Sequence, residues 1–139
     1  YPEKHEESPN MEQDIYWLKK KIEAGAEYAV TQLFYDNQKY FDFVDKVRAA
    51  GINVPIIPGI KPLSRLSQLN VIPRTFKVDL PQELTSEMIK CKSDEDMKQL
   101  GIEWGIHQCK ALIEYGVPSI HFYTVNAVQS VKEIAKVIY

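Results

Sequence analysis

The 139-residue sequence has the length of one domain, or of part of a larger one. Hydrophobic residues make up 45% and charged residues 26%, and the formal net charge is −2, which is an ordinary globular composition. This balance gives no basic surplus for nucleic acid or for an anionic membrane surface. No apolar run approaches the ~20 residues that span a bilayer. We therefore expect neither nucleic acid nor a membrane as a partner.

The cysteines bear on the cellular compartment that we expect, and the first residues on whether the sequence is part of a longer protein. Cys91 and Cys109 match no metal-binding pattern, and we expect two reduced thiols in a cytoplasmic protein. The chain begins Tyr1-Pro2-Glu3, without a methionine and directly on polar and aromatic residues. We expect these 139 residues to be one partial domain of a longer protein.

The first part of the chain alternates helical and strand patterns. Apolar residues at helical spacing predict a helix over 11–24, ended by Gly25. A short apolar run predicts a strand over 27–33 that ends in polar and aromatic residues. Asp36 is a candidate N-cap for a second helix over 37–50.

The middle of the chain is less regular. A continuous apolar run predicts a strand over 54–59, buried on both faces and with prolines near its ends. A short helix is expected over 64–70, with Ser64 as its cap. Pro81 has the character of a first-turn proline and predicts another short helix over 81–90.

The last part of the chain completes the alternation. Ser93 followed by three acidic residues predicts the start of a long helix over 94–115. A third strand is expected over 119–124, and a capping box at Asn126 predicts a final helix over 127–138. The apolar face of the long helix is expected to consist of Ile102, Ile106, Cys109 and Ile113.

This order of elements predicts an α/β fold with a parallel sheet, because strands alternate with helices and no hairpin signal joins two strands. A closed (β/α)₈ barrel needs about 250 residues. The chain therefore corresponds to about half of such a barrel.

Polar and aromatic side chains gather where the predicted strands end, which is where the loops of a barrel converge on its mouth. They are Tyr1, His5, Gln32, Asp36, Lys61, Tyr123, Thr124 and Asn126. No Ser-His-Asp set, glycine-rich phosphate loop or metal cluster accompanies them. The pattern favours binding of a flat, polar aromatic ligand, read by amides and stacked on Phe34, Tyr35 and Tyr123.

Five short motifs occur in order along nearly the whole chain. They are Tyr1-Pro2-Glu3-x-His5, Ala24-Gly25-Ala26, Thr31-Gln32-x-Phe34-x-Asp36, Ile56-Ile57-Pro58-Gly59-Ile60 and His121-Phe122-Tyr123-Thr124-x-Asn126. Each is weak alone, but together and in register they are specific. The chain resembles the C-terminal half of the methylenetetrahydrofolate reductase family, whose members are flavin-dependent (β/α)₈ barrels. On that resemblance the chain runs from the end of strand 5 through helix 8.

The resemblance implies a role for several residues. Gln32 corresponds to the family glutamine that hydrogen-bonds the folate pterin, and Gln68 to a second substrate-contacting glutamine. With the aromatic rings of Phe34 and Tyr123, they form the expected substrate site. Contacts to flavin adenine dinucleotide (FAD) are implied for Tyr1, His5, Asp14 and Lys21. A lysine and a histidine suit a pyrophosphate, and a carboxylate suits a ribose or adenine donor.

The sequence also departs from the family pattern. Glu6 stands where a proline usually follows the histidine, and Val125 replaces a leucine. Ala127 stands where the family has a substrate-binding arginine, a role that Lys61 or Arg65 could take over. A family phenylalanine that packs on the folate falls near Ile72, with Phe76 as its shifted equivalent.

The resemblance implies that the catalytic general acid lies outside these residues, in the N-terminal half of the barrel. The parent enzyme would pass a hydride from NADH or NADPH through FAD to methylenetetrahydrofolate. The isolated chain would be inactive and would carry folate-binding and part of the FAD-binding residues. We expect it to pair with the other half of the barrel or with a second copy of itself, because a half barrel exposes its sheet edges.

Two alternatives remain open from the residues alone. One is another barrel enzyme, such as a class I aldolase, with Lys61 as a Schiff-base lysine; no partner acid is evident beside it. The other is a non-catalytic ligand-binding or assembly module built on the same half barrel.

Overall fold

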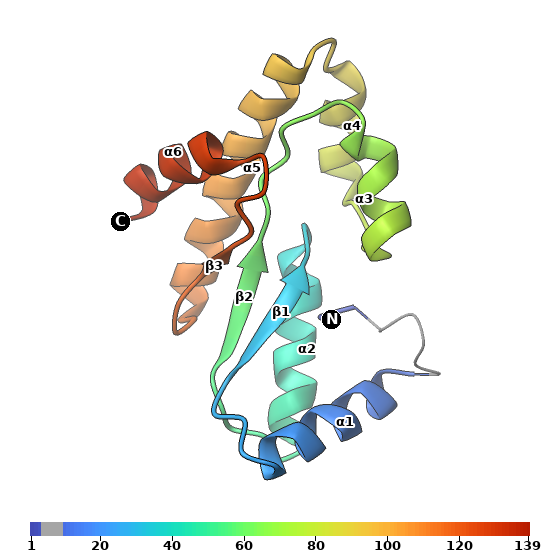
Figure 1. The fold of residues 1–139 in the computed structure, drawn as a ribbon, viewed down its shortest axis with the longest axis vertical. Helices are drawn as coiled ribbons and strands as arrows, with labels where there is room; N and C mark the ends of the chain where they lie inside the picture. Colours follow the sequence, from blue (N-terminus) through green and yellow to red (C-terminus); the bar gives the residue numbers. More distant parts are fainter. Residues whose placement is uncertain (4–9) are drawn as a thin grey trace.

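The computed structural model describes residues 1–3 and 10–139, and it has the predicted α/β class (Figure 1). Its elements are α1 (Met11–Glu23), β1 (Ala29–Leu33), α2 (Asn37–Ala49), β2 (Ile56–Ile60), α3 (Gln68–Phe76), α4 (Gln82–Lys90), α5 (Asp94–Tyr115), β3 (His121–Phe122) and α6 (Val128–Ile138). Within the described residues no helix is long and apolar enough to cross a membrane.

The three strands form one parallel sheet in the order β1-β2-β3. β2 is the central strand, and four of its five residues are buried, which confirms the predicted burial on both faces. Pro58 lies in the middle of β2 rather than near its end, and the pairing with β1 is irregular at this level. Proline has no N–H to donate, so a break in the ladder is expected beside it.

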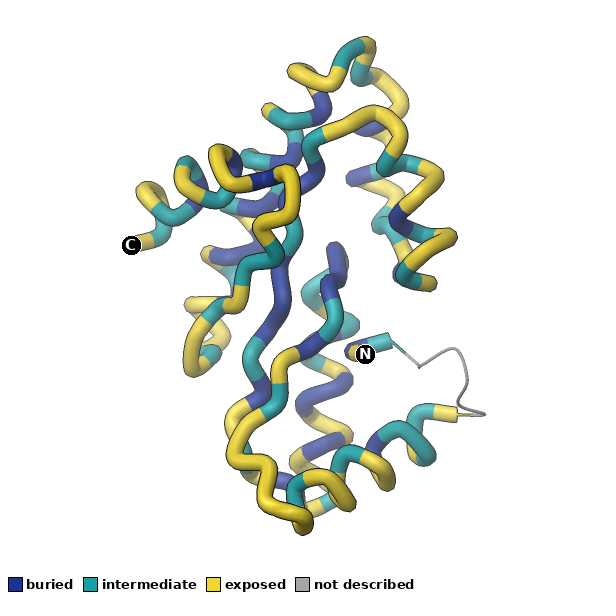
Figure 2. The backbone as a smooth tube through the Cα atoms, in the orientation of Figure 1, coloured by how far each residue is buried: buried dark blue, intermediate teal, exposed yellow. Residues whose placement is uncertain are grey.

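One hydrophobic core fills the space between the sheet and helices α2, α5 and α6. Its buried members are Ile15, Phe34, Tyr40, Phe43, Val44, Val47, Ile52, Ile56, Ile60, Cys109, Leu112 and Ile134. In Figure 2 the dark blue of buried residues runs along β2 and along one side of α2, whereas α1 is largely yellow or teal. The sheet and α2 are therefore well covered, while α1 buries only Ile15.

A second core forms around the excursion between β2 and α5, which contains α3 and α4. Its buried members are Leu33, Tyr35, Leu63, Ile72, Val78, Leu84, Met88 and Met97. Figure 1 shows α3 and α4 beyond the arrowheads of β1 and β2, at the end where these strands finish. The excursion therefore extends the fold on the side where the loops after the strands converge.

Most predicted helix ends are confirmed. The Asp36 side chain accepts a hydrogen bond from the Gln38 N–H at 3.0 Å, and the Ser93 hydroxyl accepts one from the Asp96 N–H at 3.2 Å. Gly25 follows the end of α1 with φ at +116°, a conformation that favours glycine. The helix starts are thus set by the side-chain acceptors that the sequence indicated.

Two predicted caps are wrong. Ser64 does not begin a helix, because the carboxamide oxygen of Gln68 accepts the Ser64 and Arg65 N–H groups and α3 starts only at Gln68. Asn126 does not cap α6, because its backbone adopts a left-handed conformation with φ at 58° and the helix begins at Val128. In the first loop a side chain from the start of α3 thus replaces the expected cap, and in the second the backbone conformation rules it out.

The buried face of α5 also differs from the predicted one. It consists of Met97, Gly101, Gly105, Gln108, Cys109 and Leu112. Ile113 is instead 42% exposed. Two glycines line this face because neighbouring groups come close to the helix, and an apolar pattern does not reveal such approaches. Both cysteines are free thiols, and burial raises the pKa of Cys109 to about 12, which keeps this thiol protonated.

The buried Tyr40 hydroxyl makes the stability of the fold depend on alkaline pH. It donates a 2.6 Å hydrogen bond to the Ile56 carbonyl oxygen, and burial raises its pKa from 10.0 to about 12. The unfolded chain loses this proton first, so the stabilisation is complete below pH 10 and is lost as pH rises toward 12. We expect Tyr40→Phe to cost about 1 kcal/mol at pH 7 and to flatten the alkaline decline.

Urea unfolding at pH 7 and at successive values above pH 9 measures both effects. Tyr139→Phe is the matched control, because Tyr139 is 77% exposed. An alkaline decline that is equally steep with and without the Tyr40 hydroxyl would contradict this assignment.

Candidate functional site

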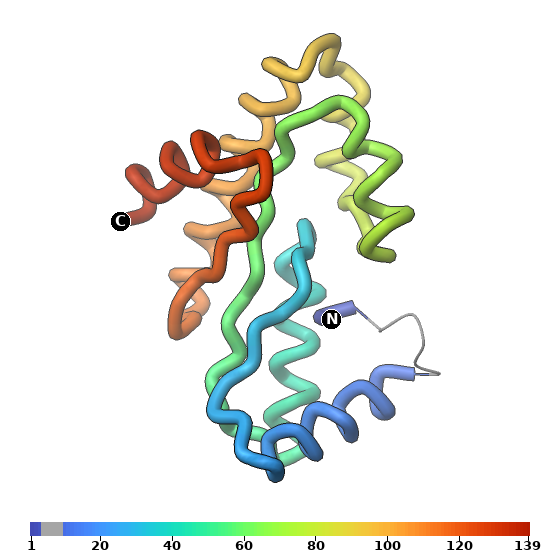
Figure 3. The backbone as a smooth tube through the Cα atoms, in the orientation of Figure 1, coloured from blue at the N-terminus to red at the C-terminus, as the bar shows by residue number. Residues whose placement is uncertain are grey.

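A cleft of about 1010 Å³ opens between α1 and β1 and reaches across to Tyr123. The N-terminal residues lie beside β1 and α2, as the course of the chain in Figure 3 shows. The cleft is lined by Tyr1, Gln13, Asp14, Trp17, Leu18, Lys21, Ala26, Tyr28, Ala29, Val30, Thr31, Gln32, Phe43, Ile56 and Tyr123. It therefore gathers side chains from both ends of the sequence.

Helix α1 forms one wall of the cleft with a row of side chains that ends in charged groups. Asp14, Trp17 and Lys21 share a face because they lie three and four residues apart. Tyr1 lines the cleft beside this wall. Three of the four predicted FAD-contacting residues thus line one cleft, and the fourth, His5, lies outside the described residues.

Strand β1 supplies the opposite wall and brings Gln32 to the cleft. The Gln32 carboxamide oxygen accepts a hydrogen bond from the Leu33 N–H at 3.1 Å, which fixes the orientation of the amide. The amide nitrogen carries two donor hydrogens, and the oxygen can still accept a second hydrogen bond. The predicted substrate glutamine therefore offers donors to a ligand.

Tyr123, directly after β3, closes the cleft and is held in place by its neighbours across the sheet. Its hydroxyl donates a 2.7 Å hydrogen bond to the Thr31 carbonyl oxygen, and its backbone N–H donates one to the Ile60 carbonyl oxygen at 2.8 Å. The ring edge also contacts His121, with centroids 4.7 Å apart. Burial raises the pKa of the Tyr123 phenol, so the hydroxyl remains a donor at neutral pH.

Phe34 and Tyr35 pack inside the protein, and the prediction that they stack on a ligand is wrong for this structure. Phe34 is fully buried and its ring stacks on Tyr40 at 5.5 Å. The Tyr35 hydroxyl donates to the Lys61 carbonyl oxygen at 2.8 Å, and its burial raises the pKa of that phenol well above the usual value. The segment after β1 turns inward because α5 captures its backbone.

Two side chains of α5 make that capture. The Trp104 ring nitrogen donates to the Tyr35 carbonyl oxygen at 3.1 Å, and the Gln108 amide donates to the Phe34 carbonyl oxygen at 3.0 Å. Phe34 is therefore held in the first core and Tyr35 in the second, and of the three predicted stacking rings Tyr123 alone lines the cleft.

Gln68 lies apart from this cleft. Its carboxamide oxygen accepts the Ser64 N–H at 2.6 Å and the Arg65 N–H at 2.9 Å, which organises the turn before α3. The side chain is half-buried. The structure therefore gives Gln68 a local capping role and does not bring it to the lining that contains Gln32.

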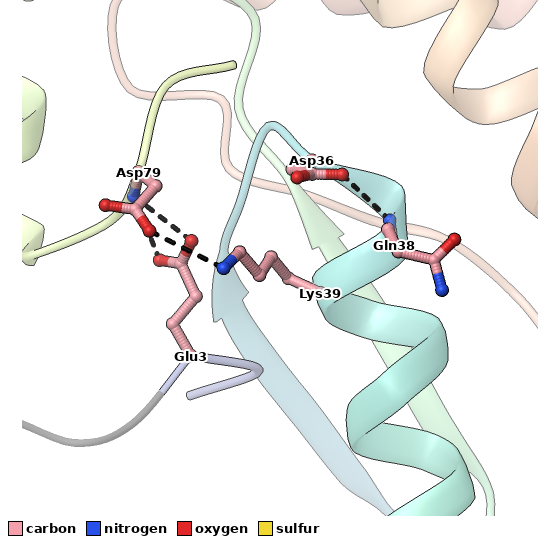
Figure 4. Close-up of polar contacts among 5 residues, drawn as sticks. All are labelled: Glu3, Asp36, Gln38, Lys39 and Asp79. Atoms are coloured by element: carbon pink, nitrogen blue, oxygen red, sulfur yellow. Dashed lines mark hydrogen bonds and ion pairs between the residues drawn. The ribbon is translucent and has the colours of Figure 1, made fainter.

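The N-terminal segment is tied to the loop between α3 and α4. Both Glu3 carboxylate oxygens lie 3.1 Å from the Asp79 N–H, and the Lys39 ammonium pairs with the Asp79 carboxylate at 3.6 Å (Figure 4). Burial raises the pKa of Glu3, and the hydrogen bond from Asp79 opposes this shift. These contacts join the segment that carries Tyr1 to the excursion that follows β2.

Three positions bear on the expected replacement of the family arginine: Lys61, Arg65 and Ala127. The Lys61 ammonium donates a 2.7 Å hydrogen bond to the Val125 carbonyl oxygen and so links the exits of β2 and β3. Burial lowers the pKa of Lys61. Ala127 is buried and Arg65 is exposed. Lys61 is thus the cation that the fold holds beside the loop of Ala127.

Sequence reasoning did not assign Trp17 and Thr31 to the site. Trp17 is 55% exposed and lines the cleft, although helical spacing gives no sign that its ring is uncovered. Thr31 directly precedes Gln32 on β1, but its hydroxyl oxygen accepts a hydrogen bond from the Gly59 N–H of β2 at 2.9 Å. That pairing depends on the register of two strands, which the sequence does not encode locally.

Comparison with known proteins assigns the family. The family model for methylenetetrahydrofolate reductase matches residues 1–138. Methylenetetrahydrofolate reductase 1 of Schizosaccharomyces pombe is 37% identical over 96% of this chain, which covers 22% of that protein. The 5,10-methylenetetrahydrofolate reductase of Pectobacterium carotovorum is 39% identical over 91% of this chain, which covers 43% of that protein.

A solved structure shares the fold. It is an uncharacterized protein from Clostridium thermocellum that binds two copies of 5-methyl-5,6,7,8-tetrahydrofolic acid, with a TM-score of 0.55 and 20% identity. The match covers 88% of this chain and 46% of that one. The chain thus spans less than half the length of these relatives. The ordered motifs, the parallel sheet and the match over residues 1–138 together place this chain in the methylenetetrahydrofolate reductase family.

Proposed function

We propose that this chain is the C-terminal half of a (β/α)₈ barrel that reduces methylenetetrahydrofolate with NADH or NADPH through bound FAD. The observation that carries the proposal is the shared cleft. Tyr1, Asp14 and Lys21, the described residues expected to contact FAD, line the same cleft as Gln32 and Tyr123, which are expected to contact folate. A flavin reaction needs both ligands in contact, so a single cleft is the arrangement that it requires.

The residues on α1 fit an FAD molecule in size and chemistry. A cleft of about 1010 Å³ lies at the upper end of the range for ligand sites, as a dinucleotide demands. The Lys21 ammonium suits the pyrophosphate, and the Asp14 carboxylate suits a ribose hydroxyl or an adenine amine. When bound, FAD would supply hydride transfer between the nicotinamide and the folate.

The residues of β1 and β3 fit the folate. Gln32 presents amide donors, which suit the carbonyl oxygen and ring nitrogens of a pterin. Tyr123 presents an aromatic ring held by Thr31, which suits a flat heterocycle. Lys61, which bonds the Val125 carbonyl oxygen near Ala127, is the cation that could attract the carboxylates of a folate tail in place of the family arginine.

The contribution of this chain to the reaction is orientation. Gln32 and Tyr123 would fix the plane of the pterin, while Tyr1, Asp14 and Lys21 would fix the cofactor against it. The resemblance to the family implies that the general acid comes from the N-terminal half of the barrel, so this chain alone would be inactive.

Reconstitution tests this function. The chain is mixed with a candidate N-terminal half and FAD, and flavin absorbance is followed through gel filtration. We expect retained flavin, NADH- or NADPH-dependent bleaching of it, and reoxidation on addition of methylenetetrahydrofolate. Well-folded halves that associate and retain no flavin would contradict the assignment.

Lys21→Ala tests the cofactor wall. Loss of a charge-assisted contact should weaken FAD binding about tenfold, measured by titration of flavin fluorescence. Lys110→Ala is the matched control, since Lys110 is exposed on α5 and does not line the cleft. Equal FAD affinity in both variants would overturn the role of Lys21.

A further inference from the structure

Gly59 leaves a space in the centre of the sheet that the ring of Tyr123 occupies. A Cβ atom built on Gly59 would lie 2.6 Å from Cε2 of Tyr123 and 2.5 Å from the Thr31 carbonyl oxygen. Both approaches are closer than a real Cβ tolerates. Glycine at this position is therefore what allows the ring of Tyr123, directly after β3, to reach the backbone of β1 across β2.

The side chain of Thr31 fixes Gly59 in this arrangement. Its hydroxyl oxygen accepts the Gly59 N–H at 2.9 Å, at the level where the pairing of β1 and β2 is irregular. Thr31 is 4% exposed, so the contact is shielded from water. Its own carbonyl oxygen accepts the Tyr123 hydroxyl at 2.7 Å. Thr31 thus holds Gly59 through its hydroxyl group and the ring of Tyr123 through its carbonyl oxygen.

We propose that Thr31 and Gly59 are positioning residues that set the ring of Tyr123 as the platform on which the flat ligand of this cleft stacks. The proposal rests on the proposed function for the identity of that ligand, but the position of the ring does not. Stacking depends on the plane and distance of the two rings, so a displaced ring would lose contact with a ligand held by Gln32.

The choice of Thr31 rather than another small residue follows from the hydroxyl contact to Gly59, because the carbonyl oxygen that accepts the Tyr123 hydroxyl belongs to the backbone. Valine would match its shape but leave the Gly59 N–H buried without an acceptor, which is costly. Serine would keep the oxygen and restore the contact. Thr31→Val and Thr31→Ser therefore separate the hydroxyl group from the volume of the side chain.

The first measurement reports on the ring itself. 3-Fluorotyrosine is placed at position 123, and its ¹⁹F resonance is recorded in the reconstituted two-half protein without ligand. We expect Thr31→Val and Gly59→Ala to move or broaden this resonance and Thr31→Ser to leave it in place. An unchanged resonance in folded Thr31→Val and Gly59→Ala proteins would overturn the positioning role.

The second measurement reports on the ligand, with 5-methyltetrahydrofolate as the probe in calorimetric titrations. We expect Thr31→Val to raise its Kd about fivefold, Gly59→Ala to raise it further, and Thr31→Ser to restore it. Thr75→Val is the matched control because Thr75 is exposed on α3. If Gly59→Ala fails to fold, the comparison of Thr31→Val with Thr31→Ser still tests the positioning role.

The outcomes distinguish this inference from the proposed function. A moved resonance with unchanged affinity would make the contacts purely structural and overturn the platform. If the wild-type protein binds no 5-methyltetrahydrofolate, the proposed function fails, and the ¹⁹F arm alone then accepts or rejects the positioning of Tyr123.

Discussion

Gly101→Ala should lower the free energy of unfolding by about 3 kcal/mol. A Cβ atom on Gly101 would collide with the carbonyl oxygen of Leu63 and would lie 2.7 Å from its carbonyl carbon and 2.8 Å from its nitrogen. These are backbone atoms, which cannot rotate away as the end of a side chain can. Relief would require α5 to separate from the segment after β2, and the gain of about 1 kcal/mol in helix propensity would not offset this.

Gly105→Ala on the same helix is the control for Gly101→Ala. Its added Cβ would meet the Cδ1 atom of Ile134 at 2.6 Å, the terminal atom of a flexible side chain. We expect a loss below about 1 kcal/mol, since a rotamer change relieves the contact. Urea unfolding of the two variants makes the comparison. Equal stability of the two would contradict the close approach of α5 to Leu63.

Gln32→Ala should weaken binding of 5-methyltetrahydrofolate by about tenfold or more in the reconstituted protein while FAD stays bound. The substitution removes the donors that we propose for the pterin and the oxygen that accepts the Leu33 N–H. Sites built to hydrogen-bond a ligand lose much of their affinity when such a group is absent, because the partner is left unpaired. Calorimetric titration gives the Kd, and flavin absorbance gives the cofactor content.

Gln99→Ala is the matched control for Gln32→Ala. The Gln99 amide donates to Glu103 on the exposed side of α5 at 3.1 Å, outside the cleft. Its loss should change neither affinity. Together with Lys21→Ala, which should affect the flavin, the series assigns the two walls of the cleft separately. Loss of flavin with Gln32→Ala would contradict that division.

The helices were largely predictable from sequence because their signals are local. Ser93 with three following acids fixed the start of α5, and residues 94–115 are the bounds observed. The strands were shorter than predicted, most of all β3, which is His121–Phe122 instead of 119–124. Strand length is decided by how far a neighbouring strand extends, and β3 pairs with β2 only from Gly59 to Ile60.

The residues that line the cleft were predictable where their position at a strand end is a local signal. They were not predictable where their placement depends on elements far away in the sequence. Gln32 and Tyr123 line the cleft, as expected from their positions at the ends of predicted strands. Phe34 has the same signal but turns into the core, since Gln108 captures its carbonyl oxygen from a helix 74 residues away. The close approach of the Tyr123 ring to Gly59 could not be predicted, because a glycine in a strand gives no sign of which side chain packs over it.

The exit of β1 has a consequence for how the molecule unfolds. Leu33 and Tyr35 are buried in the second core, and Phe34, between them, is buried in the first. Three successive residues therefore anchor the same stretch of backbone in both cores, so neither can open without withdrawing side chains from the other. Amide hydrogens of β1, α2 and α5 should accordingly exchange with one common opening free energy, as a single cooperative unit.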